Sequence, residues 1–77
     1  MNFVEAMELL RALSTILPKS LRVHPKFIFY NAEKEGYMVC VKEDSVKSDY
    51  FSFMKEIVET RHLRIRKLEG YLVIHSL

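Results

Sequence analysis

Two residue types in this chain could support nucleophilic, acid–base or metal chemistry: one cysteine and three histidines. The cysteine is Cys40, and the histidines are His24, His62 and His75. A catalytic site needs a base within hydrogen-bond reach of its target, a group that orients the base, and a pocket. Cys40 stands among apolar residues, which is typical of a small buried side chain. We therefore expect that the protein is not an enzyme.

Metal and cofactor sites are not indicated either. The histidines and the single cysteine do not have the paired spacing of a zinc site, and one cysteine cannot form an internal disulfide. The chain contains neither a glycine-rich phosphate loop nor a Gly-x-Ser-x-Gly motif. We expect no metal ion and no cofactor.

A second kind of chemistry, phosphate binding, is suggested by a cluster of basic residues late in the chain. The cluster consists of Arg61, Arg64, Arg66 and Lys67. Tyr37 and Tyr71 could stack on bases, as aromatic residues do on RNA-recognition sheets. The sequence lacks the RNP1 pattern, because Glu35 and Glu69 stand where a basic residue should precede the glycine. Nucleic-acid binding is therefore the alternative function.

Length and composition limit the architecture to one small domain. The 77 residues have room for a single core, so residues 1–77 form one domain, and 49% apolar residues can supply that core. A net charge of +2 is well below that of a nucleic-acid-binding tail. Glutamine and tryptophan are absent and charged residues are frequent, a composition similar to that of thermophile proteins.

The chain carries no recognisable membrane or export signal. No apolar run approaches the ~20 residues of a membrane span. Glu5, Glu8 and Arg11 interrupt the apolar N-terminal segment, which excludes a signal peptide. We expect a cytoplasmic protein that does not bind a membrane.

Hydrophobic periodicity predicts two helices and four strands. The helices are expected at residues 2–17 and 46–61, and the strands at 27–30, 37–42, 62–67 and 71–76. A basic connector over 18–26 contains Pro18 and Pro25. The order α-β-β-α-β-β predicts an α+β domain with a four-stranded antiparallel sheet and both helices on one face.

A short similarity suggests that the α-β-β unit is duplicated. Glu35-Gly36-Tyr37 and Glu69-Gly70-Tyr71 each precede an alternating apolar run, and we expect Gly36 at a positive φ. This alignment pairs Met38 with Leu72. A duplication and a chance match remain alternatives, because short motifs recur by chance.

The predicted order and the alternation of side chains along each strand predict which side chains face the helices. The inward set is Met38, Cys40, Leu63, Ile65, Leu72 and Ile74. The opposite face is then formed by Tyr37, Val39, Val41, Tyr71 and Val73, with Arg64 and Arg66 beside them. This face is too apolar for ordinary contact with water.

We therefore expect a small non-catalytic module for protein–protein interaction or self-association. A second copy of the chain or an unidentified protein would bind Tyr37, Val39, Val41, Tyr71 and Val73. Cover of this face by the chain's own connector, 18–26, is the competing explanation.

Overall fold

The computed structural model describes residues 1–14, 27–46 and 48–76, and it confirms the predicted order α-β-β-α-β-β. The elements are α1 (Phe3–Leu13), β1 (Ile28–Asn31), β2 (Gly36–Lys42), the 3-10 helix η3 (Glu43–Ser45), α2 (Ser48–Thr60), β3 (Leu63–Leu68) and β4 (Tyr71–Ser76). The predicted connector 18–26 lies outside the described residues.

Helix α1 begins where the sequence predicts. Asn2 accepts a hydrogen bond from the Glu5 amide, and the Glu5 carboxylate accepts one from the Asn2 amide, which forms a capping box. The apolar stripe of the helix is buried and consists of Ala6, Leu9, Leu10 and Leu13. The predicted end at residue 17 lies outside the described residues.

Helix α2 is shorter than predicted. Val46, expected inside the helix, instead follows η3 and is buried without being helical. At the other end His62 adopts a left-handed conformation with φ of 58°. Its amide donates to the Glu59 carbonyl at 3.0 Å, which closes the last turn of the helix.

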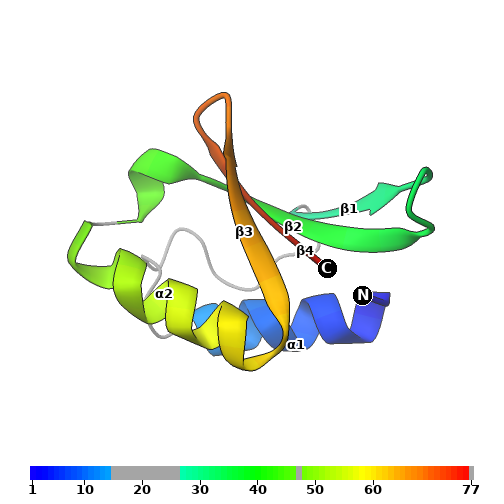
Figure 1. Ribbon diagram of the computed structural model, residues 1–77, viewed down its shortest axis with the longest axis horizontal. Coiled ribbons are helices and arrows are strands. Elements are labelled where there is room, and N and C mark those ends of the chain that lie inside the picture. Colours follow the sequence, from blue (N-terminus) through cyan, green and yellow to red (C-terminus); the bar gives the residue numbers. More distant parts are fainter. Residues whose placement is uncertain (15–26, 47, 77) are drawn as a thin grey trace.

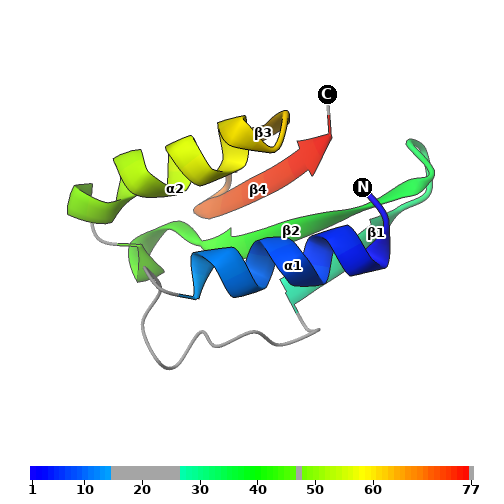
Figure 2. The same ribbon diagram turned by 90° about the horizontal axis from the view of Figure 1, so that it is seen from below.

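The four strands form one antiparallel sheet in the order β1-β2-β4-β3. The two helices lie side by side against one face of this sheet, and the other face is not covered by any described element (Figures 1 and 2). Helix α1 packs against β2 and α2 packs against β3. Strands β2 and β4 are central, so their inward side chains contribute most of the buried surface of the sheet.

The core lies between the sheet and the helices. Its members are Ala6, Leu9, Leu10, Leu13, Val39, Val41, Val46, Met54, Val58, Leu72 and Ile74. Leu63 and Ile65 of β3 pack against it from the edge of the sheet. Leu72, Ile74, Leu63 and Ile65 therefore face the helices as predicted.

The prediction for β2 is wrong in its choice of face. Val39 and Val41, predicted on the open face, are 0% and 1% exposed in the core. Val39 pairs with Ile74 and Val41 with Leu72, so these residues share the helix side. Met38 and Cys40, which alternate with them, lie on the open face instead.

The physical reason is that the two hairpin turns differ. Gly70 is in the turn itself at φ of 84°, directly after Glu69 at 49°, which makes a tight two-residue turn. Gly36 is already in β2, where it pairs with Asn31, and Glu35 rather than Gly36 takes the positive φ of 49°. The expectation of a positive φ at Gly36 is therefore wrong.

This difference also affects the proposed repeat. The alignment of the two Glu-Gly-Tyr stretches places Met38 of the open face on Leu72 of the core. The short similarity does not join structurally equivalent positions, and duplication of the α-β-β unit stays a hypothesis.

A matched pair of substitutions tests which face of the sheet is buried. Val39→Thr should lower the free energy of unfolding by about 1–3 kcal/mol, because it buries a hydroxyl among apolar side chains. Val73→Thr, on the open face of β4, should change it by no more than about 0.5 kcal/mol. Urea denaturation of both variants measures the difference. Equal costs, or a larger cost for Val73→Thr, would contradict the assignment of faces.

Candidate functional site

The strand register arranges the open-face side chains in three rows across the sheet. The first row is Phe29, Met38, His75 and Arg64; the second is Cys40, Val73 and Arg66; the third is Lys42, Tyr71 and Leu68. Each row crosses from the β1–β2 hairpin to the β3–β4 hairpin. The apolar side chains are central, and two of the three cationic side chains, Arg64 and Arg66, lie along the β3 edge.

Most of these side chains line a hollow of about 510 Å³ between the two hairpins, but Lys42 and Arg64 are not part of its lining. The β1–β2 and β3–β4 hairpins point in different directions on the side of the sheet away from the helices (Figure 1). Two aromatic side chains in the lining, Phe29 and Tyr71, are 48% and 44% exposed. Exposed aromatic rings in a hollow can contact a flat ligand such as a base or another ring.

The charged side chains of the strands are all basic. They are Lys42, Arg64, Arg66 and Lys67, and no strand contains an aspartate or a glutamate. The side chains of Lys42, Arg64 and Arg66 make no ion pair or hydrogen bond with another described residue. With respect to the described residues, these three cations are therefore available to an anion.

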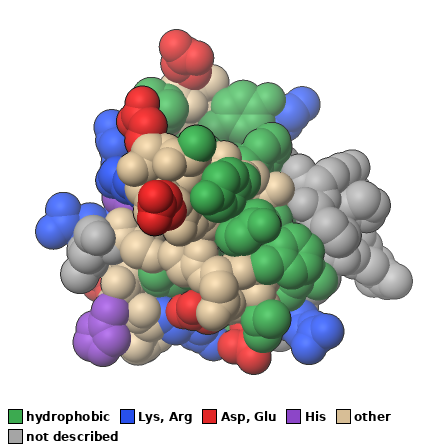
Figure 3. Space-filling model, turned by 90° about the vertical axis from the view of Figure 1, so that its right-hand side faces the viewer, with side chains coloured by type: hydrophobic (Ala, Val, Ile, Leu, Met, Phe, Trp, Pro, Cys, Tyr) green, Lys and Arg blue, Asp and Glu red, His purple; other side chains and the backbone are tan. Residues whose placement is uncertain are grey.

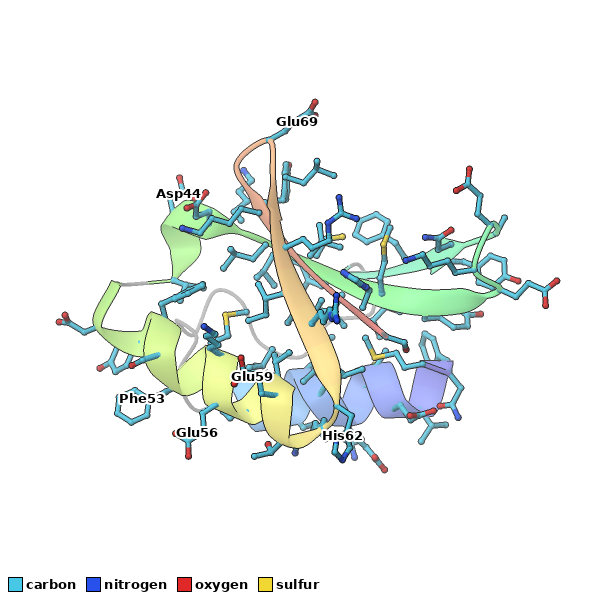
Figure 4. The ribbon with its side chains drawn as sticks, viewed as in Figure 1. Asp44, Phe53, Glu56, Glu59, His62 and Glu69 are labelled. Atoms are coloured by element: carbon cyan, nitrogen blue, oxygen red, sulfur yellow. The ribbon has the colours of Figure 1, made fainter. Side chains whose placement is uncertain are left out.

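The acidic side chains lie elsewhere. Glu56 and Glu59 are on α2, Asp44 is in η3, and Glu69 is at the tip of the β3–β4 turn (Figure 4). Glu33 and Lys34 of the β1–β2 turn and Glu69 of the β3–β4 turn also line the hollow, so its charged lining is two cations, Lys34 and Arg66, and two carboxylates. The strand rows themselves carry only cations, although the whole chain has a net charge of only +2.

The predicted basic cluster is divided by the fold. Arg64 and Arg66 lie on the open face, as predicted. Lys67 points to the helix side, where its ammonium lies 3.3 Å from Glu43 and 5.3 Å from the ring centroid of Phe51. Arg61 lies at the end of α2 and donates to the Ile57 carbonyl at 3.2 Å.

The residues predicted to bind a partner protein are divided as well. Tyr71 and Val73 lie on the open face as predicted, whereas Val39 and Val41 are in the core. Tyr37 lies on the helix side of the sheet and is only partly buried.

Tyr37 forms a cluster of rings with Phe3 and Tyr30, and the exposed Val4 follows Phe3 on α1; these four residues are called the aromatic patch. The ring centroid of Tyr37 lies 5.5 Å from that of Phe3 and 5.2 Å from that of Tyr30. Phe3, Val4 and Tyr30 are exposed. Hydrophobic side chains gather on this end of the molecule (Figure 3).

The alternation of β4 places His75 with Tyr71 and Val73, as the structure does, but sequence reasoning missed five other residues of the open-face rows: Phe29, Met38, Cys40, Lys42 and Leu68. The signal that could identify them is the β4 alternation, which was assigned correctly and fixes the face of every paired residue on β2.

Cys40 does not have the surroundings of a catalytic thiol. Burial raises the pKa of the Cys40 thiol above its ordinary value. An activated cysteine has a lowered pKa, next to a cation or a helix N-terminus. His75 lies on the same face, and within the described residues it makes no hydrogen bond with Cys40. This geometry supports the expectation of a non-catalytic protein, which stays a prediction.

A second hollow of similar volume, about 510 Å³, lies between α2 and β3. Two of its lysines are already in ion pairs, Lys55 with Glu59 at 3.9 Å and Lys67 with Glu43 at 3.3 Å. Arg64 and His62 also line this hollow, so Arg64, on the edge strand β3, borders both this hollow and the open face. Because the two lysines are already paired, Arg64 is the one arginine or lysine of this hollow without an ion pair among the described residues.

No protein-family model, curated protein or solved structure matches this chain. None of the helices in the described part of the chain is long and apolar enough to cross a membrane. The function must therefore be argued from the geometry of the open face.

The environment of Cys40 predicts how fast its thiol reacts with an alkylating reagent. Since its pKa is raised, a smaller fraction is thiolate at pH 8 than in an exposed cysteine, and alkylation by iodoacetamide should be slower. Mass spectrometry follows the reaction without ambiguity, because the chain has one cysteine. A rate equal to or above that of a short unstructured peptide containing the Met38–Lys42 sequence would contradict this environment.

Proposed function

We propose that the protein binds single-stranded nucleic acid on the open face of its sheet. The observation that carries the proposal is the coincidence, on one face of the sheet, of exposed aromatic rings with cations that have no ion pair among the described residues. Arg66 and Tyr71 line the hollow, and Arg64 and Lys42 are in the rows that border it.

The cations of the open face are suited to bind the phosphate groups of a nucleic acid. Arginine binds phosphate oxygens through two parallel N–H donors, and Arg64 and Arg66 project from the same face of one strand. Residues two apart on a strand are ~6.6 Å apart, which is similar to the spacing of successive phosphates in an extended strand. The two guanidinium groups could therefore bind neighbouring phosphates.

The exposed aromatic rings of the open face are suited to stack on unpaired bases. Phe29 and Tyr71 expose ring surface at opposite corners of the hollow, and every base can stack on an aromatic ring. In a duplex the base faces are already stacked on each other. We therefore infer a single strand of RNA or DNA, bound without catalysis. We also assign the protein to the cytoplasm, where a free thiol such as Cys40 stays reduced.

Self-association is the second candidate, and the aromatic patch favours it. In a two-fold dimer the same patch of each copy lies against the other, so a patch without central charges avoids opposing like charges. The aromatic patch of Phe3, Val4, Tyr30 and Tyr37 contains no charged residue. The open face would instead bring Lys42, Arg64 and Arg66 of one copy near those of the other. Sedimentation over a range of concentrations tests this, and a monomer at every concentration rules it out.

Substitution of the open-face arginines tests the main proposal. Arg64→Gln and Arg66→Gln should each weaken the binding of a mixed-sequence 12-mer by about tenfold, since each removes a charge-assisted phosphate contact. The slope of log K against log salt should fall in magnitude by about 0.7 for each arginine. Fluorescence anisotropy of a labelled 12-mer at several salt concentrations gives both quantities.

Arg11→Gln is the matched control, because Arg11 is exposed on α1, on the other side of the sheet. It should leave the affinity and the salt slope unchanged. Binding that does not depend on salt, or equal losses in all three variants, would exclude the open face as a phosphate-binding surface. Equal binding of duplex and single strand would exclude base stacking.

A further inference from the structure

His75 has one ring nitrogen that is bonded and one that is not. Nδ1 lies 2.7 Å from the carbonyl oxygen of Ser76. Nε2 is buried, and no described residue is its hydrogen-bond partner. Buried polar atoms in folded proteins are nearly always paired, so Nε2 has a hydrogen-bonding capacity that the described residues do not use.

The hydrogen bond of Nδ1 determines whether Nε2 is a donor or an acceptor. A carbonyl oxygen can only accept a hydrogen bond, so Nδ1 must carry the proton that it donates to Ser76. In the neutral ring Nε2 is then the unprotonated nitrogen and a hydrogen-bond acceptor. The missing partner is therefore an N–H or O–H donor.

The position of His75 makes a nucleic-acid base a suitable donor. His75 lines the hollow of the open face, in the row with Phe29, Met38 and Arg64. Its cross-strand neighbours are Met38 and Arg64, which have long side chains with several rotatable bonds. A ligand can displace such side chains without moving the backbone of the sheet.

We infer that His75 reads the edge of one base by accepting a hydrogen bond from it. This inference rests on the proposed binding of single-stranded nucleic acid and adds a base contact to the phosphate and stacking contacts. The Watson–Crick edge of adenine presents an amino donor beside a ring-nitrogen acceptor. Nε2 of His75 accepts from the amino group. Arg64 is the cross-strand partner of His75, and its guanidinium, which borders the hollow between α2 and β3 in the free protein, turns toward the open face to donate to the acceptor. Without the amino group, Nε2 stays unpaired in the complex.

Removal of a single amino group from the ligand tests the inference. The probes are an oligodeoxyadenylate 12-mer and the same 12-mer with purine, which is adenine without its amino group, at every position. The wild-type protein should bind the adenine strand about fivefold more tightly, which corresponds to one hydrogen bond of ~1 kcal/mol. The phosphates are the same in both strands, so the salt dependence should be equal.

Two variants assign the difference to His75. His75→Phe keeps an aromatic ring but removes both nitrogens, so it should bind the two strands equally. His75→Gln restores an acceptor in its side-chain carbonyl and should recover part of the preference for adenine. Circular dichroism establishes that both variants are folded, and the wild-type comparison between the two strands does not depend on either variant.

The outcomes separate this inference from the proposed function. Equal binding of both strands by the wild type, with a normal salt dependence, overturns the role of His75 and leaves nucleic-acid binding in place. A preference for adenine that persists in His75→Phe assigns base reading to another group. If neither strand binds at low salt, both the inference and the proposed function are wrong.

Discussion

The packing of one face of β2 and β4 against the two helices determines what the rest of the structure can do. Val39 and Val41 pair with Ile74 and Leu72, and all four are buried against α1 and α2. Side chains alternate along a strand, so burial of these residues places every other residue of the same strands on the open face. The surface available to a partner therefore consists of the side chains that alternate with those of the core. A shift of one residue in the register of β2 would bury its open-face side chains and expose its core side chains.

The open face that results combines three features. It contains a hollow, its strands contain no acidic residue, and its cations have no partner among the described residues. The chain as a whole is nearly neutral because its acidic side chains are on the helices, in η3 and in the turns. The net charge is therefore a poor guide to the local charge of this protein, since the strands carry only cations whereas the helices and turns carry both signs.

How much of this could be predicted depends on the local pattern. The element order follows from helical stripes and apolar runs. The faces of β3 follow from the alternation of Leu63 and Ile65 with Arg64 and Arg66, which leaves one choice. Strand β2 offers no such contrast, because Tyr37 to Val41 are apolar on both faces. Its orientation depends on where the chain leaves the turn, and Gly36 and Gly70, alike in sequence context, leave their turns differently. The pairing register of β2 with β4 determines which face of β2 is buried, and this register joins residues that lie far apart in the sequence. The unpaired nitrogen of His75 also depends on tertiary structure, because no sequence pattern shows which polar atoms are buried.

The measurement that tests the account most directly is an amide chemical-shift titration with single-stranded oligonucleotides of mixed sequence at low and moderate salt. The account predicts amide shifts at the open-face positions Met38, Cys40, Arg64, Arg66 and Val73, and these shifts should decrease as the salt concentration is raised. The amide signals of α1 and α2 should not change. Shifts centred on the helices, or no shifts at low salt, would contradict the assignment of the open face as a nucleic-acid-binding surface.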